Sequence, residues 1–175
     1  MDFKRRLIYK MLMRDKYEFL SNFYSDPKYP IIVEIEGRKL TFRNSEAAFQ
    51  AHKNPELADK FCLLTAYEAK KYGRQIPLAM SLDEWNNKKR YYAMATVLHN
   101  KFLYPDLMEK LLAVTEPIVE DNYWNDTFWG VCTNKKYNHE GKNVLGQMLT
   151  CIKETNNNFD ELIALCDKLI QEYTV

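Results

Sequence analysis

The sequence has few residues of the kinds that bind metals or form disulfides. Its four cysteines (Cys62, Cys132, Cys151 and Cys166) contain no CxxC pair, and its three histidines complete no zinc-binding spacing. Scattered cysteines of this kind are typical of reduced, mostly buried thiols, so we expect a cytoplasmic protein. We also expect a site that contains no metal and needs no cofactor.

Several long-range signals are absent as well. No apolar run reaches 18 residues, and the first 16 residues lack the apolar core and cleavage site of a secretory signal. We therefore expect no membrane partner. The chain also lacks GxxxxGK[ST], GxGxxG and GxSxG, which argues against a P-loop, a Rossmann nucleotide site and a serine-hydrolase elbow.

The net charge is only +1, from 25 basic and 24 acidic residues. This balance excludes a generic polyanion binder that works by overall charge. The charge is uneven, however, because residues 1–16 carry six basic and two acidic side chains. This basic N-terminal arm is either a solvated terminus or a segment that contacts phosphate.

The pattern of apolar residues predicts a single helix-dominated α+β domain. Residues 30–43 (PIIVEIEGRKLTFR) alternate apolar and polar side chains around Glu36-Gly37, which predicts a β-hairpin. Elsewhere, helix-capping signals precede apolar stripes of helical period. They predict helices that begin near residues 46, 66, 82, 105, 144 and 159, the third of them running to about residue 102. The signals include a cap at Asn44, a capping box at residues 65–68 (TAYE) and a cap at Asn143.

Two early stretches carry candidate functional side chains. In residues 17–24 (YEFLSNFY), Asn22 can point a donor and an acceptor into a cleft walled by Phe19 and Phe23, or the rings simply pack over the core. In residues 44–53 (NSEAAFQAHK), Glu46 and Lys53 share one helix face. The alternative is that Glu46, in the first turn, only complements the helix dipole.

A third stretch, residues 116–132 (EPIVEDNYWNDTFWGVC), interleaves aromatic rings with Glu120, Asp121 and Asp126. Carboxylates near aromatic rings lose water, which raises their pKa toward the range useful for acid–base chemistry. Trp faces stack on bases or sugars, and Gly130 lets the backbone approach a ligand. The alternative is a surface loop whose rings fill the core.

Taken together and in order, these stretches resemble the YbiA-like family, also called NADAR. The resemblance covers about residues 17–153 and is carried by FLSNFY (19–24), SEAAFQAHK (45–53), EAK (68–70), DEW (83–85), KF (101–102), IVE (118–120), DTFWG (126–130) and GKNVLG (141–146). It divides the chain into the arm (1–16), a YbiA-like domain (17–155) and a C-terminal helix packed on that domain (156–175).

The resemblance implies an N-glycosidase that cleaves the bond between ribose C1 and an amine nitrogen. Implied substrates are ribosylamine phosphates of early riboflavin synthesis or ADP-ribosyl-guanine, and an ADP-ribosylated nucleic acid is an implied partner. The implied site residues are the catalytic pair Glu46 and Asp126, and the substrate-binding residues Asn22, Phe23, Lys53, Trp85, Trp129, Gly130 and Asn143. In this interpretation one carboxylate activates water or steadies C1, the other binds ribose hydroxyls or shuttles a proton, and the indoles stack.

The sequence departs from the family pattern at two places that bear on the substrate. The arginine that often precedes the tryptophan element is replaced here by residues 78–82 (LAMSL), and Cys132 stands where a second glycine is common. Two other function classes stay open. One is a non-catalytic binder of ADP-ribose or related ligands, and the other is an interaction module that uses its exposed aromatics.

Overall fold

The computed structural model describes residues 15–134, 136–137 and 139–174. Residues 1–14 of the predicted basic arm therefore lie outside the described residues. Residue 16, the last of the arm, places its ammonium 3.7 Å from the carboxylate of Glu116. Among the described residues, none of the helices is both long and apolar enough to cross a bilayer.

The predicted hairpin is present. Strand β1 (Ile31–Ile35) pairs antiparallel with β2 (Arg38–Phe42). The two turn residues, Glu36 and Gly37, both have positive φ, at 47° and 73°, as a tight hairpin turn requires. Alternate β1 side chains are buried, and this face packs against the helices.

Helices make up most of the remaining structure, so the prediction of a helix-dominated α+β domain with a small antiparallel sheet is confirmed. The helical elements are η1 (Asp15–Leu20), α2 (Ser45–Ala51), η2 (Pro55–Phe61), α3 (Ala66–Gly73), α4 (Leu82–Glu84), η3 (Trp85–Lys89), α5 (Arg90–Lys101), α6 (Pro105–Leu112), α7 (Val144–Glu154) and α8 (Phe159–Tyr173).

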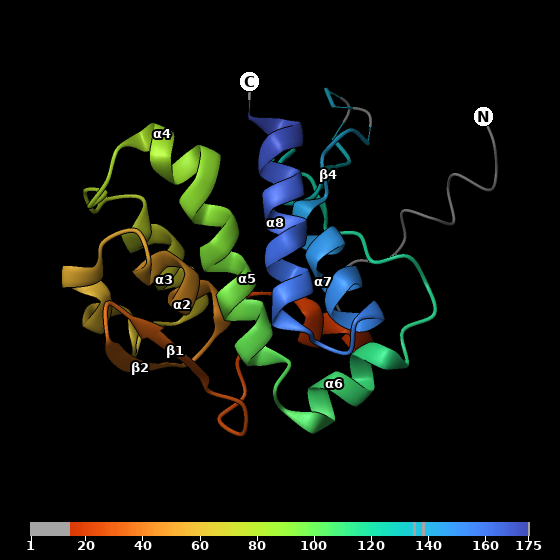
Figure 1. Ribbon diagram of the computed structural model, residues 1–175, viewed down its shortest axis with the longest axis horizontal. Helices are drawn as coiled ribbons and strands as arrows, with labels where there is room; N and C mark the ends of the chain where they lie inside the picture. Colours follow the sequence, from red (N-terminus) through yellow and green to blue (C-terminus); the bar gives the residue numbers. More distant parts are fainter. Residues whose placement is uncertain (1–14, 135, 138, 175) are drawn as a thin grey trace.

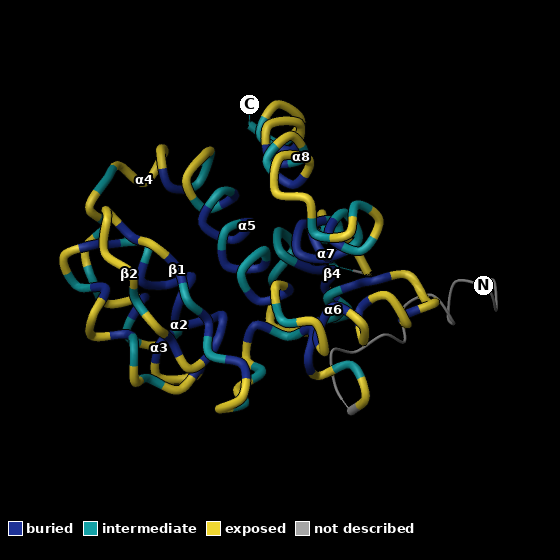
Figure 2. The backbone as a smooth tube through the Cα atoms, turned by 60° about the horizontal axis from the view of Figure 1, so that its bottom comes forward, coloured by how far each residue is buried: buried dark blue, intermediate teal, exposed yellow. Residues whose placement is uncertain are grey.

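Helix α5 is the centre of the arrangement. Figure 1 shows it running between the hairpin with α2 and α3 on one side and α7 with α8 on the other, and it contacts β1, α2, α7 and α8. Figure 2 shows that the buried backbone is concentrated in these inner elements, while α8 presents an exposed outer side. Every residue of α2 is buried, which puts its polar side chains inside the molecule.

Two local features differ from expectation. The predicted helix from residue 82 to 102 is not regular, because a π-helical turn, η3, separates α4 from α5. A second, parallel strand pair was not predicted: β3 (Asp121–Asn122) lies beside β4 (Val131–Cys132). This short pair folds the aromatic-rich stretch back on itself.

Candidate functional site

A cavity of about 320 Å³ lies where the loop after η1, helices α2, α3 and α5, and the stretch around β3 meet. Five of the nine predicted site residues line it. The lining residues are Ser21, Asn22, Phe23, Glu46, Phe49, Gln50, Lys70, Met94, Glu120, Asp121, Trp124, Asp126 and Trp129. The two predicted catalytic carboxylates, Glu46 and Asp126, therefore share one cavity although 80 positions separate them in the sequence.

Glu46 is held at the buried start of α2. The Asn44 side chain accepts a hydrogen bond from the Ala47 N–H at 2.8 Å and so caps the helix. The Glu46 N–H donates to the carbonyl of Asn22 at 2.9 Å, which ties α2 to the preceding loop. Its carboxylate accepts a hydrogen bond from Gln50 at 2.9 Å. Burial raises the pKa of Glu46, and the Gln50 hydrogen bond and nearby cations only partly oppose this rise.

Asp126 is fixed by its own loop. Its Oδ1 accepts the N–H groups of Phe128 at 3.0 Å and Trp129 at 2.9 Å. The side chain of Asn122 accepts the Asp126 N–H at 3.1 Å and donates to its carbonyl at 2.7 Å. The carboxylate therefore has a defined position beside the indole of Trp129, whose ring packs edge-on against Phe49 with centroids 5.4 Å apart.

A third carboxylate, Glu120, was not among the predicted site residues. It lines the same cavity, and within the described residues its Oε2 is buried without a hydrogen-bond partner. Burial raises its pKa to about 8, and the negative charges of Asp126 and Glu46 add to the rise. Its neighbour Asp121 also lines the cavity. The signal in the sequence was the position of Glu120 beside the apolar pair Ile118-Val119, inside the aromatic-rich stretch.

Asn22 and Phe23 occupy their predicted positions in the cavity wall, whereas Phe19 is buried in the core and is not among the lining residues. The Nδ2 of Asn22 donates to the sulfur of Met94 at 3.4 Å, and its Oδ1 is buried without a partner among the described residues. A buried carbonyl oxygen without a donor has a free acceptor site for a ligand hydroxyl or amine. Asn22 is therefore placed to orient a polar ligand beside the carboxylates.

Lys53 and Trp85 are not among the cavity-lining residues. The Lys53 ammonium donates to the carbonyl of Gly73 at 2.9 Å and lies 6.0 Å from the centre of the Trp85 ring. Trp85 is only 5% exposed and packs against Phe49 at 5.5 Å. Trp85 thus supports the cavity wall from behind, because it packs against Phe49, which lines the cavity, and Lys53 lies over the Trp85 ring.

Gly130 and Asn143 also lie outside the lining and shape the backbone that carries Glu120. A Cβ atom on Gly130 would stand 2.1 Å from the carbonyl oxygen of Glu120. Only a glycine at position 130 therefore lets the backbone there lie so close to the backbone of Glu120. Asn143 stands at the expected N-cap position of α7, but its side chain makes no capping hydrogen bond to that helix. Its side chain instead accepts the Glu120 N–H and donates to the carbonyl of Ile118, both at 2.9 Å.

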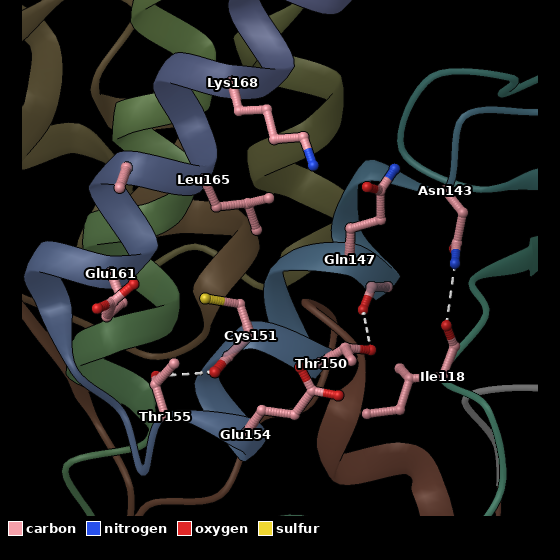
Figure 3. A pocket seen from close by; sticks show the side chains of 12 residues that line it. Ile118, Asn143, Gln147, Thr150, Cys151, Glu154, Thr155, Glu161, Leu165 and Lys168 are labelled. Atoms are coloured by element: carbon pink, nitrogen blue, oxygen red, sulfur yellow. Dashed lines mark hydrogen bonds between the residues drawn. The ribbon is translucent and has the colours of Figure 1, made fainter.

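A larger, more open cavity of about 550 Å³ lies between α7 and α8 (Figure 3). Figure 3 shows Cys151 and Gln147 on α7 facing Leu165 and Lys168 on α8. The hydroxyl groups of Thr150 and Thr155 in its wall donate to helix carbonyls at 2.8 Å. Its lining residues include two glutamates, Glu154 and Glu161, but no aromatic ring. The smaller cavity combines four carboxylates with four rings and is the candidate active site. In the described part of the chain, no group of three His, Cys, Asp or Glu side chains is arranged to hold a metal ion.

Comparison with known proteins identifies the family and the fold. The NADAR domain matches residues 9–155. The solved NMR structure of the E. coli protein YbiA is similar, with a TM-score of 0.64 and 26% sequence identity over 86% of this chain and 89% of that chain. A search of curated proteins gives no significant match. The domain match covers most of the chain and includes every residue that lines the cavity, and the protein belongs to the NADAR family.

Proposed function

We propose that the protein is an N-glycosidase that hydrolyses the N-ribosidic C1–N bond of ribosylamine phosphates or of ADP-ribosyl-guanine. The observation that carries this proposal is the meeting of Glu46, Glu120 and Asp126 in one aromatic-walled cavity. The NADAR family is associated with glycosidase-type activity, which agrees with this chemistry.

The first step is cleavage of the C1–N bond. As the bond breaks, positive charge develops at C1 in an oxocarbenium-like transition state, and the leaving nitrogen needs a proton. Glu120 has a pKa of about 8, so at neutral pH its carboxyl group is mostly protonated and can donate that proton. A carboxylate fixed close to C1 stabilises the positive charge, most effectively where water is excluded.

The second step is the addition of water. We assign Asp126 to accept a proton from the water that attacks C1, because two backbone N–H groups hold its position. The products are a ribose with a hydroxyl at C1 and the free amine or base. The proton gained by Asp126 returns through solvent, and Glu120 is reprotonated. Glu46, beside Asn22, binds the ribose hydroxyls, and Trp129 and Phe49 pack along the sugar.

The test is mass spectrometry of the full chain incubated with a ribosylamine 5-phosphate or with ADP-ribosylated DNA. We expect release of free base or of ADP-ribose. Asp126→Asn should lower the rate by about 10²–10⁴-fold, the usual contribution of an acid–base group. Glu46→Gln should also lower the rate, because the charged acceptor for the ribose hydroxyls is lost. The matched control is Glu34→Gln, which removes an exposed charge on β1 and should leave the rate unchanged.

Two results would contradict the proposal. If Glu46→Gln or Asp126→Asn hydrolyses the substrate at the full wild-type rate, the role assigned to that carboxylate is contradicted. A thermal shift with ADP-ribose but no product from either substrate class would indicate a non-catalytic ADP-ribose binder, the alternative that uses the same aromatic cavity.

A further inference from the structure

Three side chains form an aromatic and cationic collar at the rim of the candidate active site. The collar consists of Phe23 from the loop after η1, Lys70 from α3 and Trp124 from the turn after β3, and all three line the cavity. The Lys70 ammonium lies 5.4 Å from the centre of the Phe23 ring and 5.8 Å from that of Trp124. Two rings from distant parts of the chain thus flank one cation.

The collar rings differ from the other rings of the cavity in their exposure. Phe23 is 42% exposed and Trp124 is 49% exposed, whereas Phe49 is buried among Trp85 and Trp129. A ring that fills the core loses its contact with water, so Phe23 and Trp124 contribute little to the core. They are nevertheless held in place, which suits rings that offer a face to a ligand.

Local contacts orient both rings. The Phe23 N–H donates to the Ser21 hydroxyl at 3.0 Å, which fixes the turn that carries the ring. The indole of Trp124 packs edge-on against Tyr123, with centroids 5.3 Å apart. A ring whose position is set before binding loses little conformational entropy when a ligand stacks on it.

The energies favour a planar base over the lysine as the partner of these rings. A cation over an exposed aromatic ring is stabilised by about 0.5–1 kcal/mol. A nucleic-acid base stacked on an aromatic side chain is stabilised by about 1–3 kcal/mol. A base that enters the cavity can therefore displace the Lys70 ammonium from the ring faces.

We propose that Phe23 and Trp124 form a stacking subsite for the planar heterocyclic base of the ligand, with Lys70 as the group that covers the ring faces in the free protein. The inference deepens the proposed function and rests on the same cavity. It identifies the ligands as base-bearing nucleotides or nucleotide-like ribosides, and it makes Trp124 a determinant of specificity.

The experiment compares two probes that differ by a base. Binding of AMP and of ribose 5-phosphate to the full chain is measured by calorimetry. In the wild type we expect AMP to bind at least fivefold more tightly. Trp124→Leu keeps apolar bulk but loses the aromatic face, so the affinity for AMP should fall at least fivefold, while that for ribose 5-phosphate stays within twofold. Trp124→Phe is the matched control and should retain most of the AMP affinity.

The inference is overturned if the wild type binds AMP no more tightly than ribose 5-phosphate, or if Trp124→Leu leaves the ratio of the two affinities unchanged. Hydrolysis is measured separately with a ribosylamine 5-phosphate and with ADP-ribosylated DNA, the two substrate classes of the proposed function. Base-dependent binding without hydrolysis would reject the proposed function and support the collar. Hydrolysis without base-dependent binding would do the reverse.

Discussion

Glu120 illustrates how burial changes the chemistry of a single side chain. An exposed glutamate is ionised at neutral pH and cannot donate a proton. Glu120 lies in the cavity with a buried oxygen that has no partner among the described residues, and burial raises its pKa to about 8. Glu46 and Asp126 add negative charge nearby, which further favours the protonated form of Glu120.

This assignment predicts a characteristic pH profile. In the wild type, kcat/KM for base release should fall as the pH rises through about 8, because the proton donor is lost. Glu120→Gln cannot donate a proton, so its rate should be lower by about 10²–10⁴-fold and should no longer fall through that range. Steady-state rates at pH 6 to 9.5 measure both effects. A Glu120→Gln variant that keeps the decline above pH 8 would assign the proton donor to another group.

At the scale of elements, the β3–β4 pair positions Glu120, and Gly130 makes that pair possible. The Val131 N–H donates to the Glu120 carbonyl at 2.7 Å, and a Cβ atom on Gly130 would collide with that same oxygen. Because the obstructing atom is backbone, it cannot move aside without breaking the pair. The two short strands therefore require glycine at position 130.

Gly130→Ala should destabilise the protein by about 2 kcal/mol, the usual cost of overpacking, and should lower activity by displacing Glu120. Gly37→Ala is the comparison, since its Cβ would meet no atom within 4 Å and only its φ of +73° is unfavourable. That strain costs roughly 1 kcal/mol and lies in the hairpin turn, where activity should not change. Urea unfolding and rate measurements on both variants check this. A Gly130→Ala protein as stable and active as Gly37→Ala would contradict it.

Local signals in the sequence predicted the elements that depend on local contacts. The hairpin follows from alternation and a turn dipeptide, and the cap at Asn44 and the capping box at Thr65 are present as expected. The π-helical turn over Trp85–Lys89 and the parallel pairing of β3 with β4 have no such signal. Asn143 shows the limit most clearly. Its residue type and its position before α7 fit a helix cap. Its side chain instead forms hydrogen bonds with the backbone of Ile118 and Glu120.

The site, which is assembled from distant parts of the molecule, could likewise be predicted only in part from local signals in the sequence. The resemblance and the residue types identified Glu46 and Asp126, which do line one cavity. Sequence could not show that Trp85 faces the core behind Phe49, because the direction of a side chain on a helix depends on what the helix packs against. It also could not show that the Glu120 carboxyl loses water, since the cavity around it is formed in part by residues 21–23, 46–50, 70 and 94, which lie at least 26 positions away along the chain.

Two ionisable groups that lose water on folding, Lys101 and Glu120, should make the free energy of unfolding depend on pH in opposite directions. Lys101, at the end of α5, is 1% exposed, and its ammonium donates to the carbonyl of Ser21 at 2.8 Å. Burial lowers its pKa to about 7 from an ordinary 10.5. The folded state thus releases this proton more readily than the unfolded state. The stabilisation is present above pH 10.5 and is lost as the pH falls toward 7.

Glu120 acts in the opposite direction, because its pKa is higher in the folded state than in the unfolded chain. Its contribution is present below pH 4.5 and is lost as the pH rises to about 8. Each group changes the free energy of unfolding by roughly 1.4 kcal/mol per pH unit within its window. Between pH 7 and 8 the two groups change the free energy of unfolding in opposite directions. These two groups together should therefore make the stability of the wild type depend little on pH in this range.

Single substitutions should separate the two slopes. Lys101→Met should lack the rise in stability that the wild type shows above pH 7. The free energy of unfolding of the wild type minus that of Lys101→Met should therefore increase from pH 7 to 9. Glu120→Gln should lack the fall in stability that the wild type shows as the pH rises to 8. The free energy of unfolding of the wild type minus that of Glu120→Gln should therefore decrease from pH 5 to 8 and then stay constant. Urea unfolding at half-unit steps from pH 5 to 9 gives both curves. Differences that do not vary with pH would mean that neither side chain is buried as the structure places it, because a solvated lysine or glutamate titrates alike in the folded and unfolded chain.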